Sequence, residues 1–113
     1  MIHTEPNWKS YLVETTEPIF TPEQCDIISK LGRSMPPQNA QVGGGSGGKY
    51  DTKTRISHIS WIPFNHPDAI PMYKKLEEMI HKTNRRHFGF ENMAINEQAQ
   101  YTEYPEGGFY DWH

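Results

Sequence analysis

At 113 residues, with 35% hydrophobic residues and a mean hydropathy of −0.82, the chain has the length of one domain and a lean supply of core residues. A formal net charge of −3 gives no electrostatic case for nucleic-acid binding, which calls for a clustered basic face. The single cysteine, Cys25, excludes a disulfide framework and favours a reducing cytoplasm. No signal-peptide pattern and no apolar run of membrane-spanning length is present, so we expect a cytoplasmic protein with no membrane contact.

The first third of the chain predicts a short strand followed by a helix. Residues 10–14 have strand character, and Thr21 then fits a helix N-cap with Gln24 closing a capping box. Pro36 and Pro37 end the helix. The apolar stripe of this helix is predicted to consist of Ile27, Ile28, Leu31 and Met35.

Cys25 lies in the first turn of this predicted helix. We interpret it as a small apolar residue that packs against Phe20 in a hydrophobic staple. A reactive thiol is the alternative, because the start of a helix lowers the pKa of a thiol.

A glycine-rich run at residues 43–48 separates two predicted strands, the first at residues 38–42. We interpret it as a mobile loop between two strands, with an engineered linker as an alternative. That this loop closes over a ligand is a further hypothesis from its composition. A phosphate cradle is a weaker interpretation, because the Lys-Ser/Thr pair that closes a P-loop is missing.

The rest of the chain alternates between strands and one helix. Residues 54–62 have the period-two pattern of a strand, and a helix is predicted from residue 68 to about residue 87. Strands are predicted at residues 95–104 and 109–113, separated by a Pro-Glu-Gly-Gly turn. This order predicts an α+β fold with antiparallel pairing.

The segment that leads to His113 has the pattern of a metal site. In a strand, Phe109, Asp111 and His113 would share one face, and Tyr110 and Trp112 the other. A histidine followed two residues later by an aspartate can supply two ligands to one ion, and a second histidine completes the set that holds ferrous iron. The chain supplies only the first member, His113, and a lone histidine is by itself more often a surface residue than a ligand.

From about Tyr11 to His113, the chain resembles the N-terminal half of the prolyl-4-hydroxylase-like Fe(II)/2-oxoglutarate dioxygenases, and it is most similar to the PKHD-type group. The resemblance rests on four segments in the expected order. They are Phe20-Thr-Pro-Glu-Gln-Cys25, Arg55-Ile-Ser-His-Ile-Ser-Trp61, Thr83-Asn-Arg-Arg-His-Phe-Gly-Phe90, and the segment from Gln98 to Tyr104 together with Gly107-Gly-Phe-Tyr-Asp-Trp-His113.

The resemblance implies N-terminal helices packed on part of a double-stranded β-helix (jelly roll), and oxidative decarboxylation of 2-oxoglutarate coupled to hydroxylation of an aliphatic C–H. By position, His113 matches the first iron ligand and Tyr104 a tyrosine beside the co-substrate. Tyr110 and Trp112 match aromatic positions near the substrate. The implied cofactors are Fe(II) and 2-oxoglutarate, with ascorbate as a candidate. The implied substrate is a prolyl residue in a peptide or protein, or a small molecule.

The remaining family residues, which are the carboxylate ligand, the distal histidine and the basic residue that pairs with 2-oxoglutarate, would lie beyond position 113. We therefore expect the 113 residues alone to be inactive. The alternative is a non-catalytic binding or assembly module, or an inactive fragment, that associates through open strand edges.

Two other histidines are weaker metal candidates. His66 and Asp68 have the right spacing, but Asp68 is expected in the first turn of the second helix, where the helix dipole favours a carboxylate. His58 lies in a predicted strand and is interpreted as a packed or hydrogen-bonded histidine. No zinc-type spacing or nucleotide motif is present.

Overall fold

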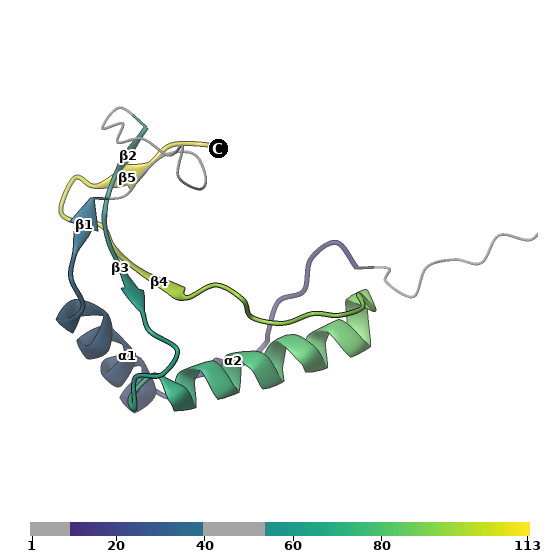
Figure 1. The fold of residues 1–113 in the computed structure, drawn as a ribbon. Helices are drawn as coiled ribbons and strands as arrows, with labels where there is room; N and C mark the ends of the chain where they lie inside the picture. Colours follow the sequence, from purple (N-terminus) through teal and green to yellow (C-terminus); the bar gives the residue numbers. More distant parts are fainter. Residues whose placement is uncertain (1–9, 40–53) are drawn as a thin grey trace, which may run out of the picture.

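The computed structural model describes residues 10–39 and 54–113, and these residues form a mixed α+β structure with two small antiparallel sheets (Figure 1). The predicted α+β class is confirmed. No helix among the described residues is long and apolar enough to cross a membrane. The elements in chain order are α1 (Pro22–Ser34), β1 (Gln38–Asn39), β2 (Arg55–Ile56), β3 (His58–Ile62), α2 (Ile70–Thr83), the π-helical turn η2 (Asn84–Phe88), β4 (Ala99–Glu103) and β5 (Phe109–Tyr110).

The two sheets are parts of one antiparallel ladder. The first has the strand order β1-β3-β4 and the second pairs β2 with β5. β2 and β3 follow one another around Ser57, with His58 opposite Glu103 in β4 and Ile56 opposite Phe109 in β5. β4 and β5 therefore pair with successive parts of the same partner, and residues 104–108 form an excursion between them. The predicted Pro-Glu-Gly-Gly turn lies in this excursion and is not a hairpin loop between two strands that pair with each other.

The start of α1 agrees with the sequence. The Thr21 N–H donates to Gln24 Oε1 over 2.9 Å, and the Gln24 N–H donates to Thr21 Oγ1 over 3.2 Å, so the predicted capping box is confirmed. Cys25 is exposed in the first turn of the helix. Within the predicted stripe, Leu31 is buried, but Ile27 is 51% exposed.

The core lies where α1 and α2 meet the end of β3 and β4 that is remote from the chain end marked C (Figure 1). The Tyr73 hydroxyl donates to the Ile62 carbonyl over 2.5 Å and accepts the Ala99 N–H over 2.7 Å. Ile62 and Ala99 face each other in the β3–β4 register, so this hydroxyl is inserted between their backbone groups. The buried cluster consists of Leu31, Ile62, Ala69, Met72 and Tyr73.

Helix α1 approaches the sheet closely at Gly32. The Ser60 hydroxyl, on β3, donates to the Gly32 carbonyl over 2.7 Å, and this contact is buried. A Cβ atom at Gly32 would lie 2.3 Å from Cγ of Tyr101, so a side chain here would force the Tyr101 ring to move. The missing Cβ allows the helix and β4 to pack against each other.

Helix α2 ends in a π-helical turn. The regular helix stops at Thr83, and Gly89 closes the turn with a φ of 73°. The buried Asn84 side chain accepts the Phe90 N–H and donates to the Phe90 carbonyl, both over 2.8 Å. The predicted helix to about residue 87 is therefore confirmed in extent, but its last turn is π-helical.

Several predicted strands differ in extent. Residues 10–14 form no strand, and Tyr11 and Leu12 are 96% and 83% exposed. The strands predicted at residues 95–104 and 109–113 are shorter, and the one at 54–62 is interrupted at Ser57. Ser57 is buried opposite the excursion, where the partner strand leaves the ladder. Of the strand predicted at 38–42, residues 38 and 39 are found, while 40–42 and the loop at 43–48 lie outside the described residues.

We expect Tyr73→Phe to lower the free energy of unfolding by about 2 kcal/mol, because it leaves the buried Ile62 carbonyl and the half-buried Ala99 N–H without their partner. Urea unfolding followed by circular dichroism measures the loss. Tyr11→Phe is the matched control at an exposed tyrosine and should change stability little. Equal stability of the two variants would contradict a structural role for the Tyr73 hydroxyl.

Candidate functional site

The candidate site is the end of the ladder formed by β2 and β5. Arg55 and Tyr110 face each other there, with the guanidinium carbon 4.4 Å from the centre of the Tyr110 ring. The Asp111 N–H donates to the Thr54 carbonyl over 2.7 Å. In an antiparallel ladder, hydrogen-bonded and non-hydrogen-bonded pairs alternate, which makes Arg55 and Tyr110 a non-hydrogen-bonded pair. Side chains of such pairs lie closest together, which explains the short cation–π contact.

His113 folds back onto the same tyrosine. Its imidazole stacks on the Tyr110 ring with centroids 3.7 Å apart and planes inclined by 13°. We predicted that these two side chains would lie on opposite faces of a strand. That prediction is wrong because β5 ends at Tyr110, and the strand alternation ends with it.

One imidazole nitrogen of His113 has a defined partner. Nδ1 lies 2.7 Å from the carbonyl oxygen of Asp111. A carbonyl oxygen only accepts, so Nδ1 is the donor in this contact, and in the neutral ring Nε2 keeps the lone pair that a metal ion needs. His113 is exposed, so Nε2 is within reach of a ligand from solution.

The described residues do not complete a metal site around His113. The Asp111 carboxylate accepts the N–H of Trp112 over 2.9 Å, and among residues 10–39 and 54–113 no group of three or more His, Cys, Asp or Glu side chains is arranged to hold an ion. His113 therefore fits as a single ligand. Asp68 precedes α2 and is not in its first turn, and its N–H donates to His66 Nδ1 over 3.1 Å.

The other predicted site residues lie apart from this stack. Tyr104 begins the excursion and is 50% exposed, and in the described part of the chain no hydrogen bond or ring contact joins it to Tyr110 or His113. Trp112 is 99% exposed. A hollow of about 440 Å³ is lined by Tyr110, Asp111, Trp112 and His113.

A second polar cluster, which the sequence did not reveal, lies on the sheet next to α1. Glu103 accepts a hydrogen bond from Arg33 Nε over 2.6 Å and another from the Tyr101 hydroxyl over 2.9 Å. The hydrogen bond from Arg33, and then that from Tyr101, holds the pKa of the Glu103 carboxyl below its usual value. His58 faces Glu103 across the ladder and lines the same hollow of about 170 Å³. The sequence could have indicated this cluster only through a correct prediction that β3 pairs with β4. That pairing brings together His58 and Glu103, which are 45 positions apart.

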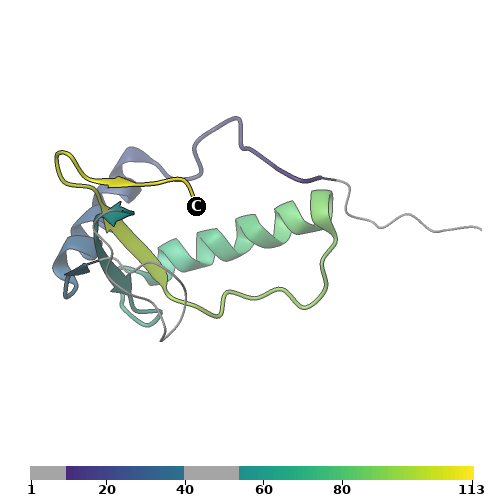
Figure 2. The same ribbon diagram turned by 90° about the horizontal axis from the view of Figure 1, so that it is seen from above.

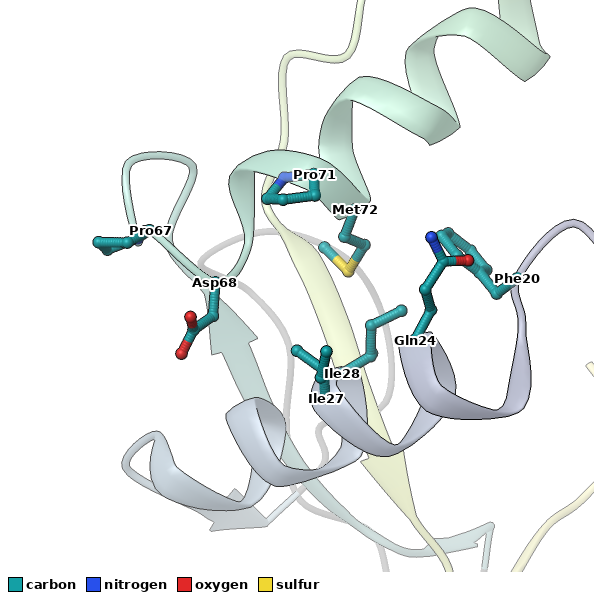
Figure 3. A pocket seen from close by; sticks show the side chains of 8 residues that line it. All are labelled: Phe20, Gln24, Ile27, Ile28, Pro67, Asp68, Pro71 and Met72. Carbon is teal, nitrogen blue, oxygen red and sulfur yellow. The ribbon is translucent and has the colours of Figure 1, made fainter.

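An apolar groove of about 140 Å³ separates α1 from the start of α2 (Figure 3). Ile27, Ile28 and Met72 point into it, Pro71 lines it on the α2 side, and Phe20 lies at one end with Pro67 and Asp68 at the other. Lys75 closes the Phe20 end, with Nζ 3.0 Å from Gln24 Oε1 and 5.3 Å from the Phe20 ring.

Seen from above, the chain ends a short way beyond β5 (Figure 2). The candidate site is therefore built on the ladder end, and no described helix contributes a side chain to the Arg55–Tyr110–His113 stack.

Comparisons with protein-family models, curated proteins and solved structures returned no match.

We expect Arg33→Gln to raise the pKa of Glu103 more than Tyr101→Phe does, because the Arg33 hydrogen bond is the larger cause of its depression. A carboxyl whose pKa is lowered on folding adds stability above its unfolded pKa, about 4.3, and this contribution is lost as the pH falls through the folded pKa. Side-chain carboxyl NMR over an acid titration measures both pKa changes. Arg86→Gln, at an exposed arginine in η2, is the control and should leave Glu103 unchanged.

Proposed function

We propose that this chain is the N-terminal part of an Fe(II)- and 2-oxoglutarate-dependent dioxygenase that hydroxylates an aliphatic C–H of a prolyl residue in a peptide or protein. The observation that carries the proposal is the state of His113. Its Nδ1 is hydrogen bonded to a backbone carbonyl, its ring is stacked on Tyr110, and Nε2 is the nitrogen left for a metal ion. The ordered motifs of the sequence, which lead to this histidine, support the same proposal.

In this proposal, His113 holds the iron through Nε2, and the other ligands come from residues outside the described chain. The bound iron supplies oxidative chemistry in which 2-oxoglutarate and O2 give succinate and CO2, and one oxygen atom enters the C–H bond of the substrate. Tyr110 keeps the imidazole in one orientation, which lowers the entropy lost when a metal binds. Trp112, fully exposed beside His113, is placed to pack against a substrate.

The double-stranded β-helix core belongs to this proposal too. A jelly roll has eight strands, and in this proposal the described strands would be part of one of its sheets. Of the described strands, β4 is an edge of the three-stranded sheet, so a further strand can be added beside it.

We expect the native polypeptide that contains these residues to form succinate from 2-oxoglutarate in an Fe(II)-dependent reaction, and His113→Ala to abolish it, because the first iron ligand is lost. Succinate release under O2, with and without Fe(II), is the measurement. His87→Ala, at an exposed histidine in η2, is the matched control and should retain full activity. Full activity in His113→Ala would rule out the proposed iron ligand. Residues 1–113 alone are expected to be inactive.

A binding or assembly module is the second candidate, and the exposed apolar groove between α1 and α2 favours it. Ile27 in the groove and Ile70 beside it are 51% and 52% exposed. Together with the open edge of β4, the groove gives the chain two surfaces that another chain can cover.

This second candidate predicts a sedimentation coefficient that rises with protein concentration, because self-association buries the groove. Ile27→Glu should shift the protein toward monomer, and Lys82→Glu, at an exposed position near the end of α2, is the control. A single monomeric species of wild type over the whole concentration range would contradict self-assembly. Analytical ultracentrifugation makes the measurement.

A further inference from the structure

Arg55 is a half-buried cation whose three contacts are all with uncharged groups. Its Nε donates to the Ser57 hydroxyl over 2.7 Å, and Nη2 contacts the Gln100 side-chain oxygen at 3.3 Å. The third contact is the Tyr110 ring. Among residues 10–39 and 54–113, no carboxylate forms an ion pair with it.

The excursion at residues 104–108 explains why none of the described carboxylates faces Arg55. Glu103 is opposite His58, so an uninterrupted ladder would place the residue three positions further on, Glu106, opposite the residue three positions back, Arg55. The excursion inserts additional residues and brings Tyr110 to that place instead. An arginine and a glutamate that would form an ion pair in a regular ladder are thereby separated.

The guanidinium is also held in place before any ligand arrives. Ser57, which lies between β2 and β3, contacts it together with groups from β4 and β5, and the Ser57 and Gln100 contacts occupy two of the five N–H donors of an arginine. The remaining donors form a planar fork, whose geometry matches the two oxygens of a carboxylate. Fixing a long side chain in advance reduces the entropic cost of binding.

We propose that Arg55 is the anchor of a carboxylate-binding site, with Tyr110 as its floor. A carboxylate fits better than a phosphate, because Asp111 follows Tyr110 directly and repels a dianion more strongly than a monoanion. The site does not depend on the proposed function, since it needs no metal ion. Its ligand is either a small carboxylic acid or an acidic side chain of a peptide.

NMR titration of the full chain in metal-free buffer tests the proposal. The probes are acetate, the blocked peptide acetyl-Gly-Asp-Gly-amide, its Asn analogue, and inorganic phosphate, with the Arg55 side-chain Nε–H as reporter. We expect this signal to shift and saturate with acetate or with the Asp peptide. The tighter of the two identifies the source of the carboxylate, and either result supports the site.

Two variants separate binding from a purely structural role. Arg55→Gln should weaken carboxylate binding about tenfold or more, and Arg55→Lys should fall between it and wild type, because lysine keeps the charge and loses the fork. Arg86→Gln is the matched control and should bind as wild type does. Four results would each overturn the proposal. In the wild type, they are an Arg55 signal that neither carboxylate moves, equal binding of the Asp and Asn peptides, and phosphate binding as tight as carboxylate binding. The fourth is unchanged carboxylate binding in folded Arg55→Gln.

Failure of this test and failure of the dioxygenase proposal are distinguishable. The NMR titration is made without iron, and loss of succinate production in His113→Ala leaves the Arg55 contacts intact. Carboxylate binding at Arg55 without succinate production would support the binding module. Succinate production without a response of the Arg55 signal would support the iron site and contradict the carboxylate site.

Discussion

The structure depends on one buried hydroxyl group, that of Tyr73, which joins α2 to both strands of the central ladder. Its partners, the carbonyl of Ile62 and the N–H of Ala99, are opposite each other at the helical end of β3 and β4. A one-residue slip of β4 would remove the Ala99 N–H from this hydroxyl and would turn Tyr101 away from Gly32. With so few buried side chains in the core, this polar contact does much to fix the strand register.

That register is transmitted to the other end of the ladder, where the candidate site lies. Gly107, with a φ of 76°, and the bond from the Gly108 N–H to the Pro105 carbonyl make the tight turn of the excursion. A Cβ at Gly108 would lie 2.8 Å from the Ile56 carbonyl, so the turn packs directly on β2. Only with this turn does Tyr110 reach Arg55, and only then can the next three residues fold His113 onto its ring.

The sequence predicted the local features well and the long-range ones poorly. Thr21 and Gln24 identify the start of α1 because a capping box is a contact between neighbours in the chain. The insertion of Tyr73 between two strands depends on residues far apart in sequence, and no pattern of neighbours contains it. Residues 10–14 were predicted to form a strand, but a strand also needs a partner, and none pairs with them in the described chain. His113 was found from the pattern, whereas its stacking on Tyr110 was not, since the strand was predicted to continue.

The Arg55–Tyr110–His113 stack would lower the entropic cost of ligand binding in an enzyme and in a binding module alike. A cation, a phenol ring and an imidazole that are already in contact lose little further freedom when a ligand arrives. In an enzyme, this order would keep a charged group of the ligand at a fixed distance from the metal ligand His113. In a binding module, it would serve affinity alone. The two functions differ in whether Nε2 of His113 binds a metal ion. In both, the strand pairing holds Arg55 and Tyr110 in place.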